Sequence, residues 1–371
     1  MPISSRLEYV LSGIVAVTLL AGCSSGSAGA PAASSAFTQQ SVATQSTSVG
    51  QQVLRSSSVL RPDVPVLHSN LRPTAFVSNE INAKGGASII VSDASDNVVD
   101  IFNARRKQTA QLTGFSQPQG LALDTAGNLY VADTNNSRIQ VYAAGFTSSP
   151  TTISDPGEFP ASVAIDSKGN LGVTNILTTS DGPGSVSFFN QGGTLLTTLS
   201  NAAFAKVLFD AFDDEGNLYI DGTNASGGFV AGEVVGGVSG TAITILATGN
   251  SVGYPGGIAI SSTGKIALDD QENLEIFTYN PPVKGSLGTP IATTALTGAG
   301  DPISFAFTRT NKRIWVADAA HGESSAPDEP NKFLVSSADK DRYPKGGASS
   351  KDILFSHGAQ PDGIVLTHAQ P

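Results

Sequence analysis

The sequence predicts an all-β fold, a β-propeller of six blades, because three features coincide. The chain contains 40 glycines and 20 prolines among many β-branched residues, a composition typical of short strands joined by tight turns. A hairpin motif recurs along the chain. The chain also ends near QPDGIVLT, residues 360–367, which repeats the opening of QPQGLALDTAGNLYVADTNNSRIQVY, residues 117–142.

The hairpin motif occurs in five internal copies. In each copy an apolar residue leads into a polar turn with Gly or Asn late in the loop, followed by an apolar residue that starts the next strand. Gly and Asn tolerate the left-handed backbone that such turns require. The copies occupy residues 123–129, 165–171, 212–218, 260–266 and 307–314. The turn glycines recur at intervals of about 42–48 residues, the range of propeller blades.

Each hairpin is flanked by two further recurring features. A segment with Pro or Gly precedes it, as in residues 118–120 and 255–257, and a third strand follows it, as in residues 138–142. The second strand of each repeat ends in an acidic or amide residue: Asp93, Asp133, Asn175, Asp221, Asp269 and Asp318. We expect these six residues to be structural and to accept hydrogen bonds from the turn that follows. The alternative is a metal site, since carboxylates suit calcium or magnesium.

These features resemble the NHL-repeat family of β-propellers. The family pattern has a P-x-G approach, a D-x-x-G-N turn, a Y-V-A-D strand and an N-x-R-I-x-V-F strand, and residues 118–142 match it nearly throughout. The resemblance covers residues 88–367, is interrupted at Gly172, at Gly222 and in the 320s, and implies a fold rather than an activity. Some lyases share this repeat, but their catalytic histidines have no counterpart that can be placed here.

The two ends of the repeat region predict ring closure. Residues 88–102 lack an innermost strand, and residues 360–367 contain only an innermost strand. Together they make one complete blade, so we expect the C-terminal strand to pair with the N-terminal blade and remove exposed edges. The alternative is an open solenoid, which has no need of complementary half-repeats.

The N-terminal 71 residues predict a secreted and anchored protein. Residues 1–22 have the length and apolar content of a signal peptide, and LAGC, residues 20–23, resembles the lipobox of bacterial lipoproteins. The resemblance implies cleavage before Cys23 and a diacylglycerol on its thiol, with acyl chains such as palmitate, and it favours the outer membrane or cell surface. An ordinary signal peptide with an incidental cysteine is the alternative. Residues 23–71 are rich in Ser, Ala, Gly and Gln and form a predicted flexible tether; residues 72–371 form the predicted propeller.

Candidate function lies where the repeat is broken, because a residue present in every blade serves the fold. Residues 177–184, 223–228 and 319–331 lengthen three blades, and loops of this length are uncommon without a role, although evolutionary drift also produces them. The third departure contains His321, Glu323, Asp328 and Glu329, which we take as the candidate binding loop. No catalytic residues are assigned.

The predicted function is a lipid-anchored, extracytoplasmic binding or scaffolding module, monomeric, with a protein or glycan partner and no cofactor. The balance of 21 basic to 31 acidic residues disfavours nucleic acid, whose phosphates require a basic face. The alternative is a propeller enzyme of the lyase or lactonase type with a divalent metal near the central channel.

Overall fold

The computed structural model describes residues 76–77, 88–296, 298–308, 311–319, 337–343, 345–346, 353–355 and 360–367. The chain divides into two compact units, Met1–Ser69 and Asn70–Pro371, and all the described residues belong to the second unit. Cys23, the predicted tether and the binding-loop residues His321, Glu323, Asp328 and Glu329 lie outside them. No helix among the described residues is long and apolar enough to cross a membrane.

The described strands form six sheets, which we number along the chain. Sheet 1 contains β26 (Pro361–Leu366), β2 (Ile89–Asp93), β3 (Val98–Phe102), β4 (Gln108–Leu112) and β1 (Phe76–Val77); sheet 2 contains β5 (Pro118–Leu123), β6 (Leu129–Asp133), β7 (Arg138–Tyr142) and β8 (Thr151–Ser154). Sheet 3 contains β9 (Glu158–Ile165), β10 (Leu171–Thr178), β11 (Ser185–Phe189) and β12 (Leu195–Leu199).

Sheet 4 contains β13 (Lys206–Phe212), β14 (Leu218–Thr223), β15 (Phe229–Val234), β16 (Thr244–Thr248) and β20 (Ser286–Gly288). Sheet 5 contains β17 (Pro255–Ile260), β18 (Ile266–Asp270), β19 (Glu275–Tyr279) and β21 (Ala292–Ala295); sheet 6 contains β22 (Pro302–Phe307), β23 (Arg313–Asp318), β24 (Ser337–Arg342) and β25 (Ile353–Leu354). Two short 3₁₀ helices, η1 (Thr134–Asn136) and η2 (Gly237–Ser239), complete the described elements.

The recurring hairpin turn has one local cause. In the turn between β5 and β6, the Asp124 carboxylate accepts hydrogen bonds from the amides of Ala126 and Asn128 at 2.9 and 2.8 Å. Gly127 adopts φ +82°, a left-handed conformation that favours glycine. Asp166 and Asp213 hold the turns of sheets 3 and 4 in the same way. The D-x-x-G-N pattern therefore closes the hairpins of sheets 2, 3 and 4 with its own side chains.

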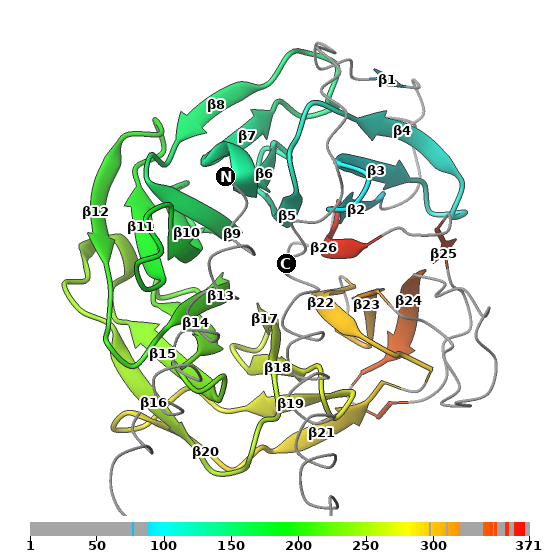
Figure 1. Ribbon diagram of the computed structural model, residues 1–371. Helices are drawn as coiled ribbons and strands as arrows, with labels where there is room; N and C mark the ends of the chain where they lie inside the picture. The colour runs from blue at the N-terminus through cyan, green and yellow to red at the C-terminus, as the bar shows by residue number, and fades with distance from the viewer. Residues whose placement is uncertain are drawn as a thin grey trace, which may run out of the picture. The chain divides into compact units, whose positions relative to one another are not determined.

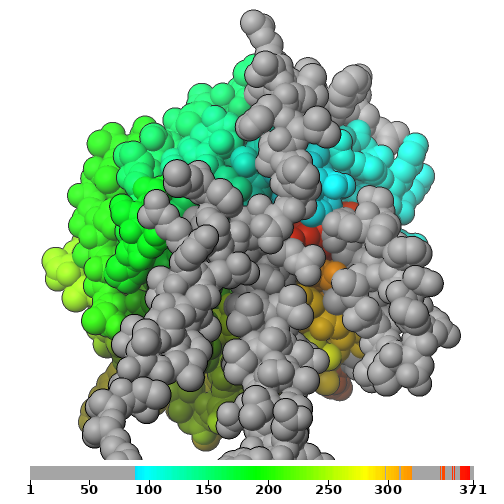
Figure 2. Space-filling model, viewed as in Figure 1, coloured from blue at the N-terminus to red at the C-terminus, as the bar shows by residue number. Residues whose placement is uncertain are grey.

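The sheets are arranged around a common centre, with β5, β9, β13, β17, β22 and β26 nearest to it (Figure 1). Each of these innermost strands contacts the next one, and β22 contacts β26. Figure 2 shows the residues of β26, in red, between those of sheets 1 and 6. Among the described residues, these innermost strands are therefore the elements nearest to the centre.

The apolar core lies between the sheets. The buried apolar residues form six clusters among the described residues, and each cluster contains side chains from two neighbouring sheets. For example, Val99 of sheet 1 and Val131 of sheet 2 share one cluster, and Trp315 of sheet 6 packs with Ile364 of β26. A single sheet leaves its faces exposed, so the sheets stabilise one another by burying apolar surface.

Strand β26 pairs with a strand from the opposite end of the unit. It runs antiparallel to β2, with Ile364 opposite Val91 and Leu366 opposite Ile89. An innermost strand is expected to bury Ile364, Val365 and Leu366. Ile364 and Leu366 are buried, but Val365 is only half-buried and packs against the cluster shared by sheets 1 and 2.

Candidate functional site

The two departures from the repeat that the structure describes in full lie at one end of the sheets. The innermost and second strands of each sheet are antiparallel, so the second strand ends where the innermost strand begins. The pairing of Asp133 with Pro118 and of Asp318 with Pro302 shows this arrangement. The connections from second to third strand therefore leave from this end, which we call the loop face. Residues 177–184 and 223–228 lie there, and residues 319–331 begin there, directly after β23.

Aspartates at the ends of second strands fasten the chain at the loop face. Oδ1 of Asp93 accepts hydrogen bonds from the amides of Ser95 and Asp96 in the following turn. It also accepts one from the amide of Gln360, which enters the innermost strand. Asp133 accepts from the Ser116 amide in the same way. These bonds hold the residues that precede β26 and β5 against the second strands of their own sheets. The sequence pattern did not reveal this contact.

The same position in sheets 5 and 6 is occupied by Asp270 and Asp318. Asp270 accepts from the amides of Gly253 and Tyr254, and Asp318 accepts from the amides of Gly300 and Asp301. Asp270 pairs with Pro255, as Asp133 pairs with Pro118. The fastening aspartate of sheet 5 is therefore Asp270 and not Asp269.

For Asp221 and Asp269 the structure corrects the alignment of the repeats by one residue. Side chains alternate along a strand, so both carboxyl groups lie on the opposite side from the fastening position. Gly222 occupies that position in sheet 4, where it pairs next to the entrance of β13. No described group makes a hydrogen bond of normal geometry with either carboxylate. The expectation of hydrogen bonds from the following turn was wrong for both residues.

Asn175 occupies the fastening position of sheet 3 but reverses its chemistry. Its Nδ2 donates to the hydroxyl groups of Ser185 and Ser187 at 3.1 and 3.0 Å. The side chain is completely buried, and its Oδ1 has no hydrogen-bond donor among the described residues. In sheet 3 this position therefore holds an amide that donates to β11, where sheets 1, 2, 5 and 6 have a carboxylate that accepts from the approach to the innermost strand.

The carboxyl groups of Asp221, Asp269 and Asp362, which we call the central carboxyl groups, are buried and have no hydrogen-bond donor of normal geometry among the described residues. Burial raises the pKa of all three well above the usual range. Neighbouring carboxylates raise the pKa further, Asp270 that of Asp269 and Asp93 that of Asp362, while Asp301 acts on both. Burial therefore disfavours the charged form of each central carboxyl group.

Within the part of the chain that the structure describes, no group of three or more His, Cys, Asp or Glu side chains is arranged to hold a metal ion. The four histidines of the sequence lie outside the described residues. The central carboxyl groups can donate or accept hydrogen bonds, which is the chemistry that they offer in the arrangement shown here.

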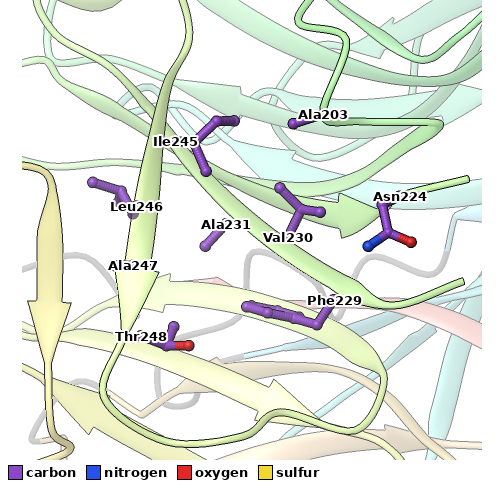
Figure 3. A pocket seen from close by; sticks show the side chains of 9 residues that line it. All are labelled: Ala203, Asn224, Phe229, Val230, Ala231, Ile245, Leu246, Ala247 and Thr248. Atoms are coloured by element: carbon purple, nitrogen blue, oxygen red, sulfur yellow. The ribbon is translucent and has the colours of Figure 1, made fainter. Parts of the chain in front are cut away.

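A pocket of 480 Å³ opens on sheet 4 (Figure 3). Apolar side chains line most of it, among them Phe229, Val230 and Leu246, and Asn224 and Thr248 add an amide and a hydroxyl group. Asn224 belongs to the departure at residues 223–228, and its Oδ1 holds that loop by accepting from the amides of Ser226 and Gly228. The composition is typical of binding pockets, apolar with few polar groups. The sequence marked the loop but not the apolar side chains, which come from separate strands.

Comparisons with known proteins agree with this architecture. Residues 115–142 match the family model of the NHL repeat. A chain in a crystal structure of a nidogen/laminin complex is 17% identical with a TM-score of 0.58, and the match covers 77% of this chain and 100% of that chain. A protein of unknown function from Bacteroides caccae is 13% identical with a TM-score of 0.54, covering 76% of this chain and 99% of that one.

No curated protein matches the chain. The matched repeat spans one hairpin and its third strand. Structural similarity at 17% and 13% sequence identity indicates a shared fold but not a shared activity. Together with the radial sheets and the clusters between them, they identify the chain as an all-β β-propeller that contains an NHL repeat.

Proposed function

We propose that this protein is a lipid-anchored, extracytoplasmic β-propeller that binds a protein or glycan partner through its loop face, as a monomer. The observation that carries the proposal is the position of the departures. Two of the three lie on the loop face and the third begins there, and one of them contributes Asn224 to the pocket. Binding residues are commonly found on loops that a rigid scaffold positions, and a propeller provides such a scaffold.

The proposal includes a six-bladed ring closed by β26. Two observations support it: β26 pairs with β2 over five residue pairs, and β26 also contacts β22 of sheet 6. Closure would leave no unpaired innermost edge on sheet 1, because β2 would otherwise present its backbone groups to other chains. A closed ring would also hold the loops of distant sheets at fixed separations.

The lipid anchor is proposed from the LAGC motif at Cys23. Acyl chains contribute about 0.8 kcal/mol per buried methylene, so two or more chains make a stable anchor. Cys23→Ser should release the protein from membranes of the native host, the outer membrane being the expected location, and mass spectrometry should find no acylated N-terminus. A variant that still fractionates with membranes would contradict the anchor without affecting the binding proposal.

Binding is tested by recovery of a partner from the native cell envelope. We expect Phe229→Ala, which removes the aromatic wall of the pocket, and a shortened loop at residues 319–331 each to lower recovery of the partner. Val283→Ala is the matched control, since Val283 is 70% exposed and lies outside the pocket and the departures. Equal recovery by wild type and both variants would place the binding surface elsewhere.

A propeller enzyme of the lyase or lactonase type remains the second candidate, favoured by the buried carboxyl groups of Asp221, Asp269 and Asp362. Such an enzyme would need a divalent metal near these groups. Elemental analysis of wild type and Asp269→Asn discriminates: a metal lost on this substitution supports the enzyme, and metal content that does not change contradicts it.

A further inference from the structure

A second group of buried oxygen atoms lies on sheet 3, away from the central carboxyl groups. It is formed where the connection from β8 enters β9 and meets the ends of β10 and β11. Its members are Asp155, Glu158, Asn175, Ser185 and Ser187. Ser187 Oγ donates to Asp155 Oδ1 at 3.0 Å, and Asn175 Nδ2 donates to both serine hydroxyl groups. The group is thus one connected polar cluster, which we call the sheet 3 oxygen cluster.

Three oxygen atoms of this cluster are buried and have no hydrogen-bond donor of normal geometry among the described residues: Asp155 Oδ2, Glu158 Oε2 and Asn175 Oδ1. Asn175 and Ser185 lie close enough to Asp155 and Glu158, respectively, to lower the pKa of each carboxyl group in part. Asp155 is 1% exposed and Asn175 is 0% exposed. An unpaired buried oxygen destabilises the folded state, and more strongly when it carries charge. The unpaired oxygen of Asn175 belongs to a neutral amide. The lack of hydrogen-bond donors is therefore not confined to the acidic side chains.

The cluster lacks the cation that the equivalent position of sheet 2 contains. There Asp133 pairs with Arg138 across the hairpin, and the guanidinium group donates to the carboxylate. In sheet 3 the corresponding pair is Asn175 and Ser185, so the arginine is replaced by a hydroxyl. Neither Asp155 nor Glu158 forms an ion pair with any described lysine or arginine. Two carboxylates therefore share a buried region with neutral neighbours.

The raised pKa values of Asp155 and Glu158 are those of carboxyl groups in a region without a neighbouring positive charge. Burial raises the pKa of Asp155 to about 6. Burial, together with the nearby Asp155 carboxylate, raises the pKa of Glu158 to about 7. A positive ion next to both groups would favour their charged forms.

A departure from the repeat covers this region. The amide of Thr179, in the lengthened connection after β10, donates to the carbonyl of Gly157 at 2.8 Å, and Thr178 pairs with Glu158. Strand β10 therefore extends beyond the fastening position and encloses the connection between Asp155 and Glu158. The equivalent strand of sheet 2, β6, ends at Asp133 itself.

We propose that the sheet 3 oxygen cluster binds a hard cation, Ca²⁺, through Asp155, Glu158 and the amide oxygen of Asn175. Calcium prefers carboxylate and amide oxygens in flexible geometry and accepts water molecules as further ligands. Bound calcium supplies the counter-ion that Arg138 provides in sheet 2, and it fixes the connection into β9 to the extended end of β10. The role is independent of the proposed partner at the loop face.

The test is equilibrium dialysis of the full chain, extracted in detergent, against radioactive Ca²⁺, with melting temperatures measured in Ca²⁺ and in a chelator. We expect one ion per chain and a melting temperature higher by about 5 °C or more at saturating Ca²⁺. Asp155→Asn and Glu158→Gln should each weaken binding at least tenfold. Both variants should still melt cooperatively in chelator, which separates loss of the site from loss of the fold.

Two control variants locate the ion. Asp181→Asn removes a carboxylate from the neighbouring exposed loop, and Asp269→Asn removes one from the centre. Both should bind Ca²⁺ as wild type does. The proposal is overturned if wild type binds no Ca²⁺ at millimolar concentration, if Asp155→Asn binds it unchanged, or if Asp269→Asn abolishes binding and so places the ion at the centre.

Discussion

Arg138 Nε donates a hydrogen bond of 2.7 Å to Oδ2 of Asp133, whose side chain is completely buried while that of the arginine is 29% exposed. The Nδ2 group of Asn136 donates to the same carboxylate at 2.9 Å. Burial raises the pKa of Asp133, and Arg138 opposes that shift. The pair thus keeps a charge inside sheet 2, where an uncompensated carboxylate would destabilise the fold.

Arg138→Gln should lower the free energy of unfolding by about 1–3 kcal/mol at neutral pH, because it leaves the buried Asp133 carboxylate without its cation. The folded-state pKa of Asp133 already lies above its unfolded value, and loss of the arginine raises it further. The deficit should therefore shrink as the pH falls through that pKa, because the neutral acid no longer needs a cation. Urea unfolding at pH 7 and pH 5 measures this; a deficit that is equal at both values would contradict the explanation.

Asp210 should make the propeller more stable in mild acid than at neutral pH. The group is buried, its carboxyl oxygens have no donor of normal geometry among the described residues, and burial raises its pKa to about 7. The folded state then binds a proton that the unfolded state releases above about pH 4. By linkage, stability rises as the pH falls from about 8 toward 5.

Asp210→Leu tests the origin of this pH dependence, because Leu121 occupies the equivalent position of β5. We expect the free energy of unfolding of the variant to exceed that of wild type by about 1–4 kcal/mol at pH 8. Its stability should also depend less steeply on pH. Asp166→Asn, in an exposed hairpin turn, is a control that should leave the slope unchanged. Thermal melts across the pH range measure this dependence. If the stability of the variant depends on pH as steeply as that of wild type, the effect comes from other carboxyl groups.

Gly256→Ala should destabilise the protein by about 1–3 kcal/mol through overpacking. A methyl group at this position would lie 2.7 Å from Oδ2 of Asp269, closer than normal contact allows. In sheet 2, Gln119 corresponds to Gly256 and Ala132 corresponds to Asp269. A side chain is present at the first position there, and the residue at the second position is small. The double variant Gly256→Ala with Asp269→Ala should therefore recover stability, and a double-mutant cycle measures the coupling. Additive losses would show that the two positions do not interact.

Deletion of residues 360–371 should yield insoluble or loosely folded protein. Ile364 and Leu366 are buried, and burial of such side chains contributes about 1.5–3 kcal/mol each. The deletion also exposes the edge of β2, which pairs with β26, as a template for aggregation. Circular dichroism and size-exclusion chromatography follow both effects. Removal of residues 24–59 is the control and should leave the melting temperature unchanged; a soluble, cooperatively melting truncation would contradict closure by this strand.

Much of the local structure follows from the sequence because its cause is local. The Asp124 carboxylate, the left-handed Gly127 and Asn128 lie within five residues of chain and close their turn by themselves. A repeat of such turns, with apolar strands between them, predicts hairpins wherever it occurs. The same reasoning could not choose between Asp269 and Asp270, since a shift of one residue moves a side chain to the other side of the strand. The pairing of Asp270 with Pro255 makes that choice.

By itself the sequence determined the all-β class, the repeat and the pairing expected of its two incomplete ends, because strand period and turn chemistry act between near neighbours. The tertiary structure alone decided which buried oxygens lack a partner and which side chains meet at the pocket. Asp155, Asn175 and Ser187 are brought together from three strands or connections of sheet 3, and Phe229 and Leu246 from two strands of sheet 4. Burial and mutual distance set the charge and hydrogen bonding of these groups, and both depend on packing between segments that are separate in the chain.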